Sequence, residues 1–246
     1  MVEQKEEWFK TWFDTSYYHI LYQNRDFSEA ERFITNLLDH LKLSKNANCL
    51  DLACGKGRHS VFLNKNGLTV TGVDLSENSI SEAKPFENDS LKFDVHDMRE
   101  VYKENEYDIV FNLFTSFGYF DNYDNNLKVL NAVNKMLVSN GKVVIDFMSA
   151  DFVLNNLVKQ EVKTMDGIDF HITRKYDGKH IYKNIDFTDQ GKNYSFQEKV
   201  QAIKKDEFES LLEKAGFEVI DVFGDFSLTQ FDKVTSDRLI IIAKKK

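Results

Sequence analysis

The sequence has little cysteine and little proline, and each shortage excludes a class of structure. Its 246 residues include two cysteines, Cys49 and Cys54, which fit neither a disulfide framework nor the paired C-x-x-C spacing of a zinc site. We therefore expect two buried free thiols, as in a reducing compartment. The single proline, Pro85, leaves the turns of the chain to Gly, Asn, Asp and Ser.

The sequence also lacks an excess of positive charge, a long apolar run and a metal-binding pattern. The net charge of -8 argues against a nucleic-acid backbone as the main partner, because phosphate binding needs a basic stripe. No stretch reaches the roughly 18 apolar residues of a membrane span, and the first residues have no apolar run of signal-peptide length. The six histidines form no H-E-x-x-H pattern. We expect a cytoplasmic protein without a membrane, nucleic-acid or metal partner.

What the sequence does contain is a regular alternation of strand and helix patterns. Strands are expected at 47–53, 68–75, 91–97, 107–114 and 141–148, and helices at 58–66, 77–84 and 126–138. This alternation predicts a mostly parallel, doubly wound sheet, in which the carboxyl ends of the strands share one ligand-binding edge. Before it, aromatic residues over 8–22 recur at helical spacing, and Ser28 with Glu31 matches a capping box that would open a helix over 28–41.

A different pattern occupies residues 160–203. Alternating residues are broken by Asp-Gly at 166–167, Asp-Gly at 177–178 and Gln-Gly at 190–191, which indicates a meander of three or four antiparallel strands. A helix over 204–217 and two strands at 218–226 and 238–245 follow and are expected to rejoin the main sheet. We therefore predict an α/β fold with seven strands in the main sheet, an antiparallel β insert at 160–203 and an N-terminal helical segment.

The glycine turn in "LDLACGKGRHS" raises the question of its ligand. Gly55 and Gly57 match the start of the dinucleotide fingerprint G-x-G-x-x-G, but the third glycine position holds Ser60. Asp51 lies four residues before Gly55, at the end of the first strand. A carboxylate there would repel a pyrophosphate and attract a cationic ligand.

Carboxylates also end the next two strands. Asp74 ends the strand in "VTGVDLS", at the place where dinucleotide sites have an acid that binds ribose hydroxyls, and Asp97 follows the third strand in "FDVHDMR". Three acids at one sheet edge predict a ligand that has a ribose, carries positive charge and lacks a pyrophosphate. S-adenosylmethionine (SAM) has these features.

Four segments in the right order, "LDLACGKGR", "VTGVDLS", "VHDMR" and "LVSNGKVVID", resemble motifs of the class I SAM-dependent methyltransferases. The resemblance covers residues 48–147. It implies a Rossmann-like domain formed by 1–150 and 204–246. The aromatic N-terminal segment and "NLFTSFGYF" resemble a bacterial subgroup that methylates small molecules, as a monomer or homodimer.

The resemblance also implies how the cofactor is held. Asp51 would lie beneath the methionyl amino group, and Asp74 would bind both ribose hydroxyls. The turn that lets the cofactor lie close would be formed by Ala53, Gly55 and Gly57. The adenine would be bound by Leu75, Asp97 and Met98, and the methionyl and methyl end would be lined by Asn112 and Leu113.

The acceptor side is expected from the N-terminal segment and from residues 115–120. Candidate substrate-binding residues are Tyr17, Tyr22, Arg25, Ser116 and Tyr119. Either Tyr18 or His19 could act as a general base, if the acceptor carries a proton of high pKa. The β insert is interpreted as a flap over the acceptor pocket, and its basic residues over 171–184 favour an anionic acceptor.

Three alternatives remain open from the sequence. A nicotinamide-dependent oxidoreductase would share the strand–turn–helix unit, but Ser60 and Asp51 argue against it. A non-catalytic SAM-binding module would share the whole cofactor site. A nucleic-acid methyltransferase would usually have an N-P-P-Y-like motif where this chain has "NLFTSF".

Overall fold

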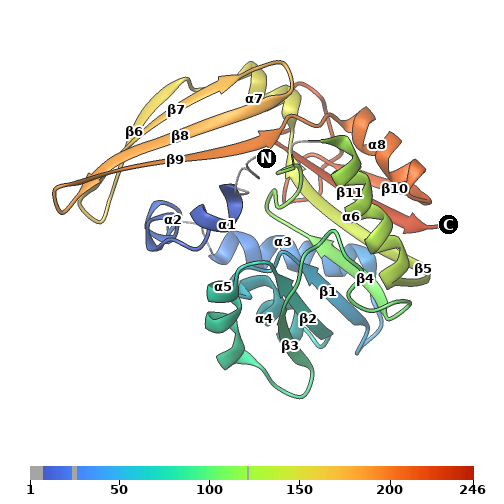
Figure 1. Ribbon diagram of the computed structural model, residues 1–246. Helices are drawn as coiled ribbons and strands as arrows, with labels where there is room; N and C mark the ends of the chain where they lie inside the picture. Colours follow the sequence, from blue (N-terminus) through green and yellow to red (C-terminus); the bar gives the residue numbers. More distant parts are fainter. Residues whose placement is uncertain (1–7, 24–26, 121) are drawn as a thin grey trace, which may run out of the picture.

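The computed structural model describes residues 8–23, 27–120 and 122–246, and within them the chain forms two β-sheets (Figure 1). The larger sheet has seven strands in the order β10-β11-β5-β4-β1-β2-β3. These are β1 (Asn48–Leu52), β2 (Thr69–Asp74), β3 (Leu91–Val95), β4 (Tyr107–Asn112), β5 (Leu137–Met148), β10 (Phe217–Phe223) and β11 (Arg238–Lys245). Among them β11 alone runs antiparallel to both of its neighbours. The predicted seven-stranded, mostly parallel sheet is confirmed.

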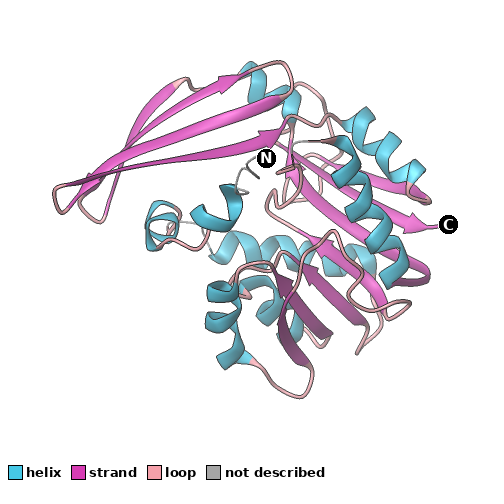
Figure 2. Ribbon diagram, in the orientation of Figure 1, coloured by secondary structure: helices cyan, strands magenta, loops and turns pink. Residues whose placement is uncertain are grey.

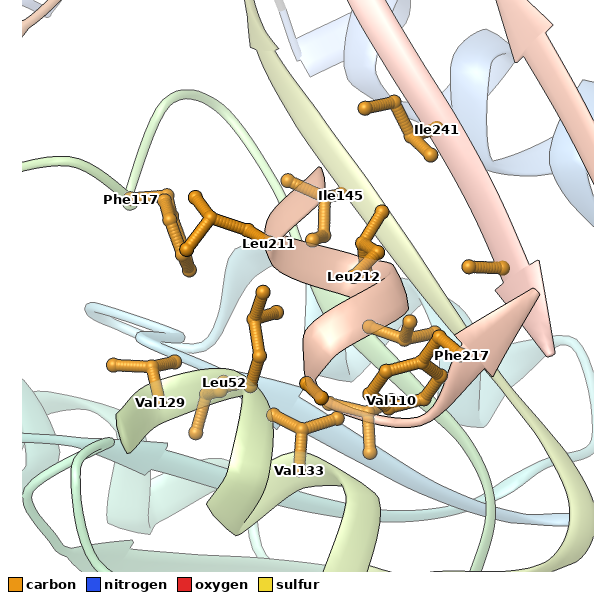
Figure 3. Packing of buried hydrophobic residues seen from close by; sticks show 14 of the residues in the cluster. Leu52, Val110, Phe117, Val129, Val133, Ile145, Leu211, Leu212, Phe217 and Ile241 are labelled. Atoms are coloured by element: carbon orange, nitrogen blue, oxygen red, sulfur yellow. The ribbon is translucent and has the colours of Figure 1, made fainter. Parts of the chain in front are cut away.

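Helices cover both faces of this sheet (Figure 2). One face packs against α3 (Phe27–Leu41), α4 (Arg58–Lys65) and α5 (Glu77–Ala83), and a 3-10 helix, η1 (Lys84–Phe86), follows α5. The other face packs against α6 (Tyr123–Met136) and α8 (Lys205–Lys214). There Val133 of α6 and Leu212 of α8 are fully buried against the strands (Figure 3). The carboxyl ends of the parallel strands β1, β2 and β4 lie at one edge of the sheet, between these two layers of helices.

The second sheet is antiparallel and has the order β6-β7-β8-β9. Its strands are β6 (Gln160–Met165), β7 (Ile168–Tyr176), β8 (His180–Asp189) and β9 (Lys192–Gln201), and α7 (Ala150–Asn155) precedes them. This β insert reaches from the main sheet over two short helices, α1 (Trp8–Trp12) and α2 (Ser16–Leu21) (Figure 1). Its inner face buries Phe170, Ile185 and Phe187 in one apolar cluster with Trp12. The insert and the N-terminal helices thus form one packed unit.

Several boundaries differ from the sequence-based expectation. The aromatic N-terminal segment is broken into α1 and α2, because Thr15 caps α2 by accepting a hydrogen bond from the Tyr18 N–H at 3.1 Å. Helix α3 begins at Phe27, before the expected cap Ser28. Helix α6 ends at Met136 and β5 already begins at Leu137, whereas the helix was expected to reach 138 and the strand to start at 141.

The two C-terminal strands rejoin the main sheet, as expected. They pair antiparallel to each other at one side of the sheet, where β11 lies between β5 and β10, and β10 forms the edge. None of the helices in the described ranges is both long and apolar enough to cross a membrane.

Candidate active site

The turn after β1 brings the backbone against the end of β2. Ala53 and Gly55 have left-handed φ values of 64° and 55°, and the Gly55 N–H donates to Asp74 Oδ2 at 2.8 Å. A Cβ on Gly55 would meet no atom within 4 Å, so this position opens onto free space. Gly57 differs, because a Cβ there would lie 2.5 Å from the ring of Phe93. Gly57 therefore allows close packing, and Gly55 leaves the backbone accessible.

Asp74, the last residue of β2, is held by the backbone on both sides. Its Oδ1 accepts from the Ser76 N–H at 2.9 Å, and its Oδ2 accepts from Gly55. Burial raises the pKa of this carboxyl above its ordinary value. A carboxylate can accept about four hydrogen bonds, so capacity remains for a ligand. Helix α5 is capped by Ser76 and not by Asp74, since Ser76 Oγ accepts from the Ser79 N–H.

Asp51 lies beneath the turn and is almost completely buried. Its Oδ2 accepts a hydrogen bond from Ser60 Oγ at 2.6 Å. Burial raises the pKa of Asp51 to about 6, and the nearby charge of Asp74 adds to this effect. The hydrogen bond from Ser60 acts in the opposite direction. Asp51 is therefore a carboxyl whose charge depends on pH near neutrality.

Asp97 follows β3 and is bound by an arginine that the sequence analysis did not select. Arg99 Nε donates to Asp97 Oδ1 at 3.0 Å, and Arg99 Nη2 donates to Oδ2 at 2.5 Å. The Arg99 guanidinium also lies 4.9 Å from the centre of the Phe120 ring. A ligand amino group would share the Asp97 carboxylate with this arginine.

Asn112 ends β4 and carries an unsatisfied polar atom. Its Nδ2 donates to the Leu52 carbonyl at 3.0 Å, while its Oδ1 is buried and has no hydrogen-bond partner in the described parts of the chain. A buried acceptor without a partner carries a free-energy penalty of about 1–3 kcal/mol. Besides the carboxylates at this edge, Asn112 therefore provides a hydrogen-bond acceptor that has no donor within the described residues.

One cavity of about 830 Å³ connects these strand ends with the N-terminal helices and the β insert. We call it the central cavity. The predicted site residues that line it are Tyr18, His19, Tyr22, Ala53, Gly55, Asp74, Leu75, Asp97, Met98, Leu113, Ser116 and Tyr119. Residues from distant parts of the sequence thus meet around one space.

The other predicted site residues do not line the central cavity. Asp51, Gly57 and Asn112 lie behind its wall. The Tyr17 side chain points into the β insert, where its hydroxyl donates to Asp189 Oδ2 at 2.9 Å and its ring packs against Phe187. This contact explains why Tyr17, unlike the adjacent Tyr18, is kept from the cavity. Arg25 lies outside the described residues.

A comparison with known proteins identifies the family. The protein-family model described as a methyltransferase domain matches residues 22–222 of this chain. The chain belongs to the class I SAM-dependent methyltransferases. It is 28% identical over 237 residues to the glycine/sarcosine N-methyltransferase of Aphanothece halophytica, covering 90% of this chain and 83% of that protein.

Solved structures have the same fold as this methyltransferase. A SAM-dependent methyltransferase from Clostridium acetobutylicum superposes with a TM-score of 0.79 at 21% identity, covering 93% of this chain and 96% of that one. The sugar N-methyltransferase KedS8 from Streptoalloteichus gives a TM-score of 0.72 at 18% identity, covering 93% and 92% of the two chains. The match to the methyltransferase family, and not this likeness of fold, argues against the oxidoreductase alternative.

The cofactor of the methyltransferase is SAM, and the residues at the strand ends fit it. SAM has donors in its hydroxyl, amino and ammonium groups, and the carboxylates of Asp74 and Asp97 line the cavity as acceptors. The carboxylate of Asp51 and the unpaired Oδ1 of Asn112 are buried beside it. The exposed backbone at Gly55 leaves room for close approach.

The β insert forms the far wall of the methyltransferase's cavity with a hydrogen-bonded chain. Tyr22 OH donates to Glu198 Oε1 at 2.6 Å, and Trp12 Nε1 donates to the same oxygen at 2.8 Å. Lys183 Nζ donates to the Tyr22 hydroxyl and lies 3.7 Å from Glu198 Oε2. Burial lowers the pKa of Lys183.

Sequence analysis missed Glu198 and singled out Lys183 only within a basic segment. The two residues are direct cross-strand neighbours on β8 and β9. Only the register of the insert reveals this pairing, and register depends on contacts that are not local in sequence.

Proposed function

We propose that this methyltransferase transfers the methyl group of SAM to the nitrogen of a small amine. The observation that carries the proposal is the continuity of the central cavity between the strand-end acids and the insert. Its volume of about 830 Å³ is typical of small-molecule sites and has to hold both cofactor and acceptor. The space that remains suits an acceptor of metabolite size.

A nitrogen acceptor is supported by two of the similar proteins. The relative from Aphanothece is named as an N-methyltransferase of glycine and sarcosine, and KedS8 is described as a sugar N-methyltransferase. Both names refer to small acceptors with an amino group.

We assign the cofactor-binding roles as follows. Asp74 accepts from the ribose hydroxyls. Leu75, Asp97 and Met98 hold the adenine. Leu113 lines the methionyl end, with the buried Asp51 and Asn112 beneath it. SAM supplies a methyl group on a sulfonium, so that a bond from the acceptor nitrogen to carbon forms as the carbon–sulfur bond breaks. The protein contributes alignment of the two reactants and exclusion of water.

Aromatic side chains exclude water from the acceptor end of the cavity. The ring of Trp8 lies 5.1 Å from that of Tyr119 and 5.4 Å from that of Phe13. All three rings line the cavity. An amine bound beside them would lose most of its hydration, which favours its neutral, nucleophilic form.

A protonated amine must lose a proton before it can attack. Lys183 is one candidate to accept that proton, because burial lowers its pKa and its hydrogen bond to Tyr22 continues to Glu198. Tyr18 and His19 also line the cavity and are the other candidates for this role.

The proposal is tested with SAM that carries an isotopically labelled methyl group. The protein is incubated with a panel of small amines, each paired with the analogue in which a hydroxyl replaces the amino group, and with a metabolite extract. We expect labelled product from one or more amines and none from the hydroxyl analogues. Label found only in hydroxyl compounds, in protein or in nucleic acid would contradict the proposal.

A further inference from the structure

The segment after β4 has a backbone conformation that its side chains disfavour. Phe114 and Thr115 have φ values of 57° and 61°. Bulky and β-branched residues rarely adopt this left-handed region. Two such residues in succession persist only where the surrounding structure holds them. Because both residues line the central cavity, the strain lies in the wall of the active site.

One buried residue binds both strained residues, Phe114 through its carboxylate and Thr115 through its backbone carbonyl. Asp146, near the end of β5, is 0% exposed. Its Oδ2 accepts from the Phe114 N–H at 2.8 Å, and its backbone carbonyl accepts from the Thr115 N–H at 2.9 Å. These two bonds fix the directions of two successive N–H groups. Asp146 thereby sets the conformation of the segment.

Arg238, the first residue of β11, completes the arrangement. Its Nε and Nη2 donate to Asp146 Oδ1 at 2.8 and 2.6 Å, and Nη2 also donates to Thr115 Oγ1 at 3.2 Å. Its guanidinium lies over the Phe226 ring, which in turn lies 5.4 Å from the ring of Phe114. The strained segment is therefore held through its backbone, a side-chain hydroxyl and an aromatic ring.

Stability alone does not explain this ion pair. A buried ion pair is often no more stabilising than apolar side chains of similar volume, because both charges lose their hydration. For Asp146, burial raises the pKa more strongly than Arg238 lowers it. The geometry that the pair imposes on Phe114 and Thr115 is its distinctive effect.

We propose that Asp146 and Arg238 are positioning residues for methyl transfer, which hold Phe114 and Thr115 in the shape that forms the cavity wall beside the cofactor. Asp146 acts through this segment and does not itself line the cavity. Alignment within a fraction of an ångström decides the rate of an in-line displacement, so a relaxed segment would impair both cofactor binding and transfer. The inference does not depend on which acceptor the enzyme uses.

The first test replaces the carboxylate by an amide of the same shape. In Asp146→Asn the single carbonyl oxygen cannot accept from both Arg238 and Phe114. We expect at least a tenfold loss of SAM affinity in calorimetry, together with faster hydrogen exchange over residues 113–120. Val133→Ala serves as the matched control, because it destabilises the same sheet from the buried α6 side, away from the cavity. It should lower the melting temperature without changing SAM affinity.

The second test asks whether relief of strain restores binding. Glycine adopts left-handed φ values freely and so removes the strain that the lost contacts no longer offset, and adding Thr115→Gly to Asp146→Asn should recover part of the SAM affinity although the hydroxyl that Arg238 contacts is also lost. Because glycine also relieves strain in the fold, the melting temperature should rise as well. Val133→Ala, in which a change of melting temperature leaves SAM affinity unaltered, shows that the recovered affinity is not a consequence of stability. Wild-type affinity in folded Asp146→Asn, or no recovery in the double variant, would overturn the proposal.

A third variant covers the case in which Asp146→Asn does not fold. Thr115→Val leaves the ion pair intact and removes only the hydroxyl that Arg238 contacts. We expect SAM affinity to fall at least threefold and exchange over 113–120 to rise. Unchanged affinity in this variant would equally overturn the proposal.

Discussion

Ser60 stands where a dinucleotide fingerprint has its third glycine, and the structure gives a physical reason for the difference. Its buried hydroxyl donates to Asp51 at 2.6 Å. Glycine at this position would remove a hydrogen bond from a carboxyl that is already desolvated. Ser60, whose presence argues against a dinucleotide ligand, thus also stabilises the charged form of the buried Asp51.

The raised pKa of Asp51, about 6, predicts that SAM binding depends on pH. A cation bound nearby stabilises the ionised carboxyl and lowers its pKa in the complex. Binding should therefore release protons near pH 6, and affinity should increase as the pH rises through this value. Calorimetry in two buffers of different ionisation enthalpy measures the released protons.

Asp51→Asn is the matched variant for this measurement. It should bind SAM more weakly at neutral pH and release fewer protons. Asp74, whose pKa is also raised, would account for any release that remains. A flat pH profile with no proton release from the wild-type protein would contradict the prediction.

At the scale of single residues, local spacing predicted the acids and glycines but not their partners. Asp74, Asp97 and Gly55 follow strands that the sequence marks clearly, and all three line the central cavity. Tyr17 and Tyr18 could not be told apart, because which of two adjacent residues on α2 points into the cavity depends on how the helix rotates against the insert. That rotation is fixed by contacts with Phe187 and Asp189, far along the chain.

At the scale of elements, the N-terminal helices depend on the insert. Helices α1 and α2 have five and six residues, which is too short for stability in isolation. Glu198 on β9 accepts hydrogen bonds from Trp12 of α1 and from Tyr22, which follows α2. One carboxylate thus attaches both helices.

Glu198→Ala should therefore loosen the N-terminal helices while the main sheet stays intact. It removes two hydrogen bonds to a charged group, each with a net contribution of about 1.5–3 kcal/mol. We expect at least tenfold faster hydrogen exchange over residues 8–23 and no comparable change in β1 or β4. Glu218→Ala, at an exposed acid on β10, is the control. Equal rates of hydrogen exchange over residues 8–23 in Glu198→Ala and Glu218→Ala would refute the role of Glu198.

The boundary between α6 and β5 was predicted poorly, because it depends on strand pairing and not on a local cap. The apolar spacing of α6 continues through Leu137, so the sequence extends the helix, but Leu137 pairs with Tyr107 in the main sheet. The pairing of β4 with β5 then shifts its register before Ile109. Only this pairing between separate segments ends the helix at Met136.

At the scale of the whole molecule, the part of the core around Leu212 lies apart from the cavity. Leu212 of α8 is 0% exposed and packs with Val133 and Phe217 on the face covered by α6 and α8 (Figure 3). It does not line the central cavity.

Leu212→Ala should accordingly reduce stability without affecting the ligand site. Loss of a buried leucine side chain typically destabilises a protein by about 2–5 kcal/mol. Urea unfolding should show this loss, and SAM affinity well below the unfolding transition should stay unchanged. A parallel loss of SAM affinity would mean that the core and the cavity are coupled.

The overall architecture was predictable because alternating strands and helices leave few topologies. The position of the insert over α1 and α2 was not, since it rests on contacts between residues 8–22 and 165–198. The division into a domain of 1–150 plus 204–246 and an insert of 160–203 stays a prediction.

The central claim is that carboxylates at successive strand ends hold the cofactor, and Asp74 tests it most directly. Calorimetric titration should show SAM binding to the wild-type protein, and Asp74→Ala should weaken that binding at least tenfold, or about 1.4 kcal/mol, because charge-assisted hydrogen bonds to the ribose are lost. Circular dichroism should confirm that the variant is folded. A folded Asp74→Ala protein with the affinity of the wild type would contradict the account.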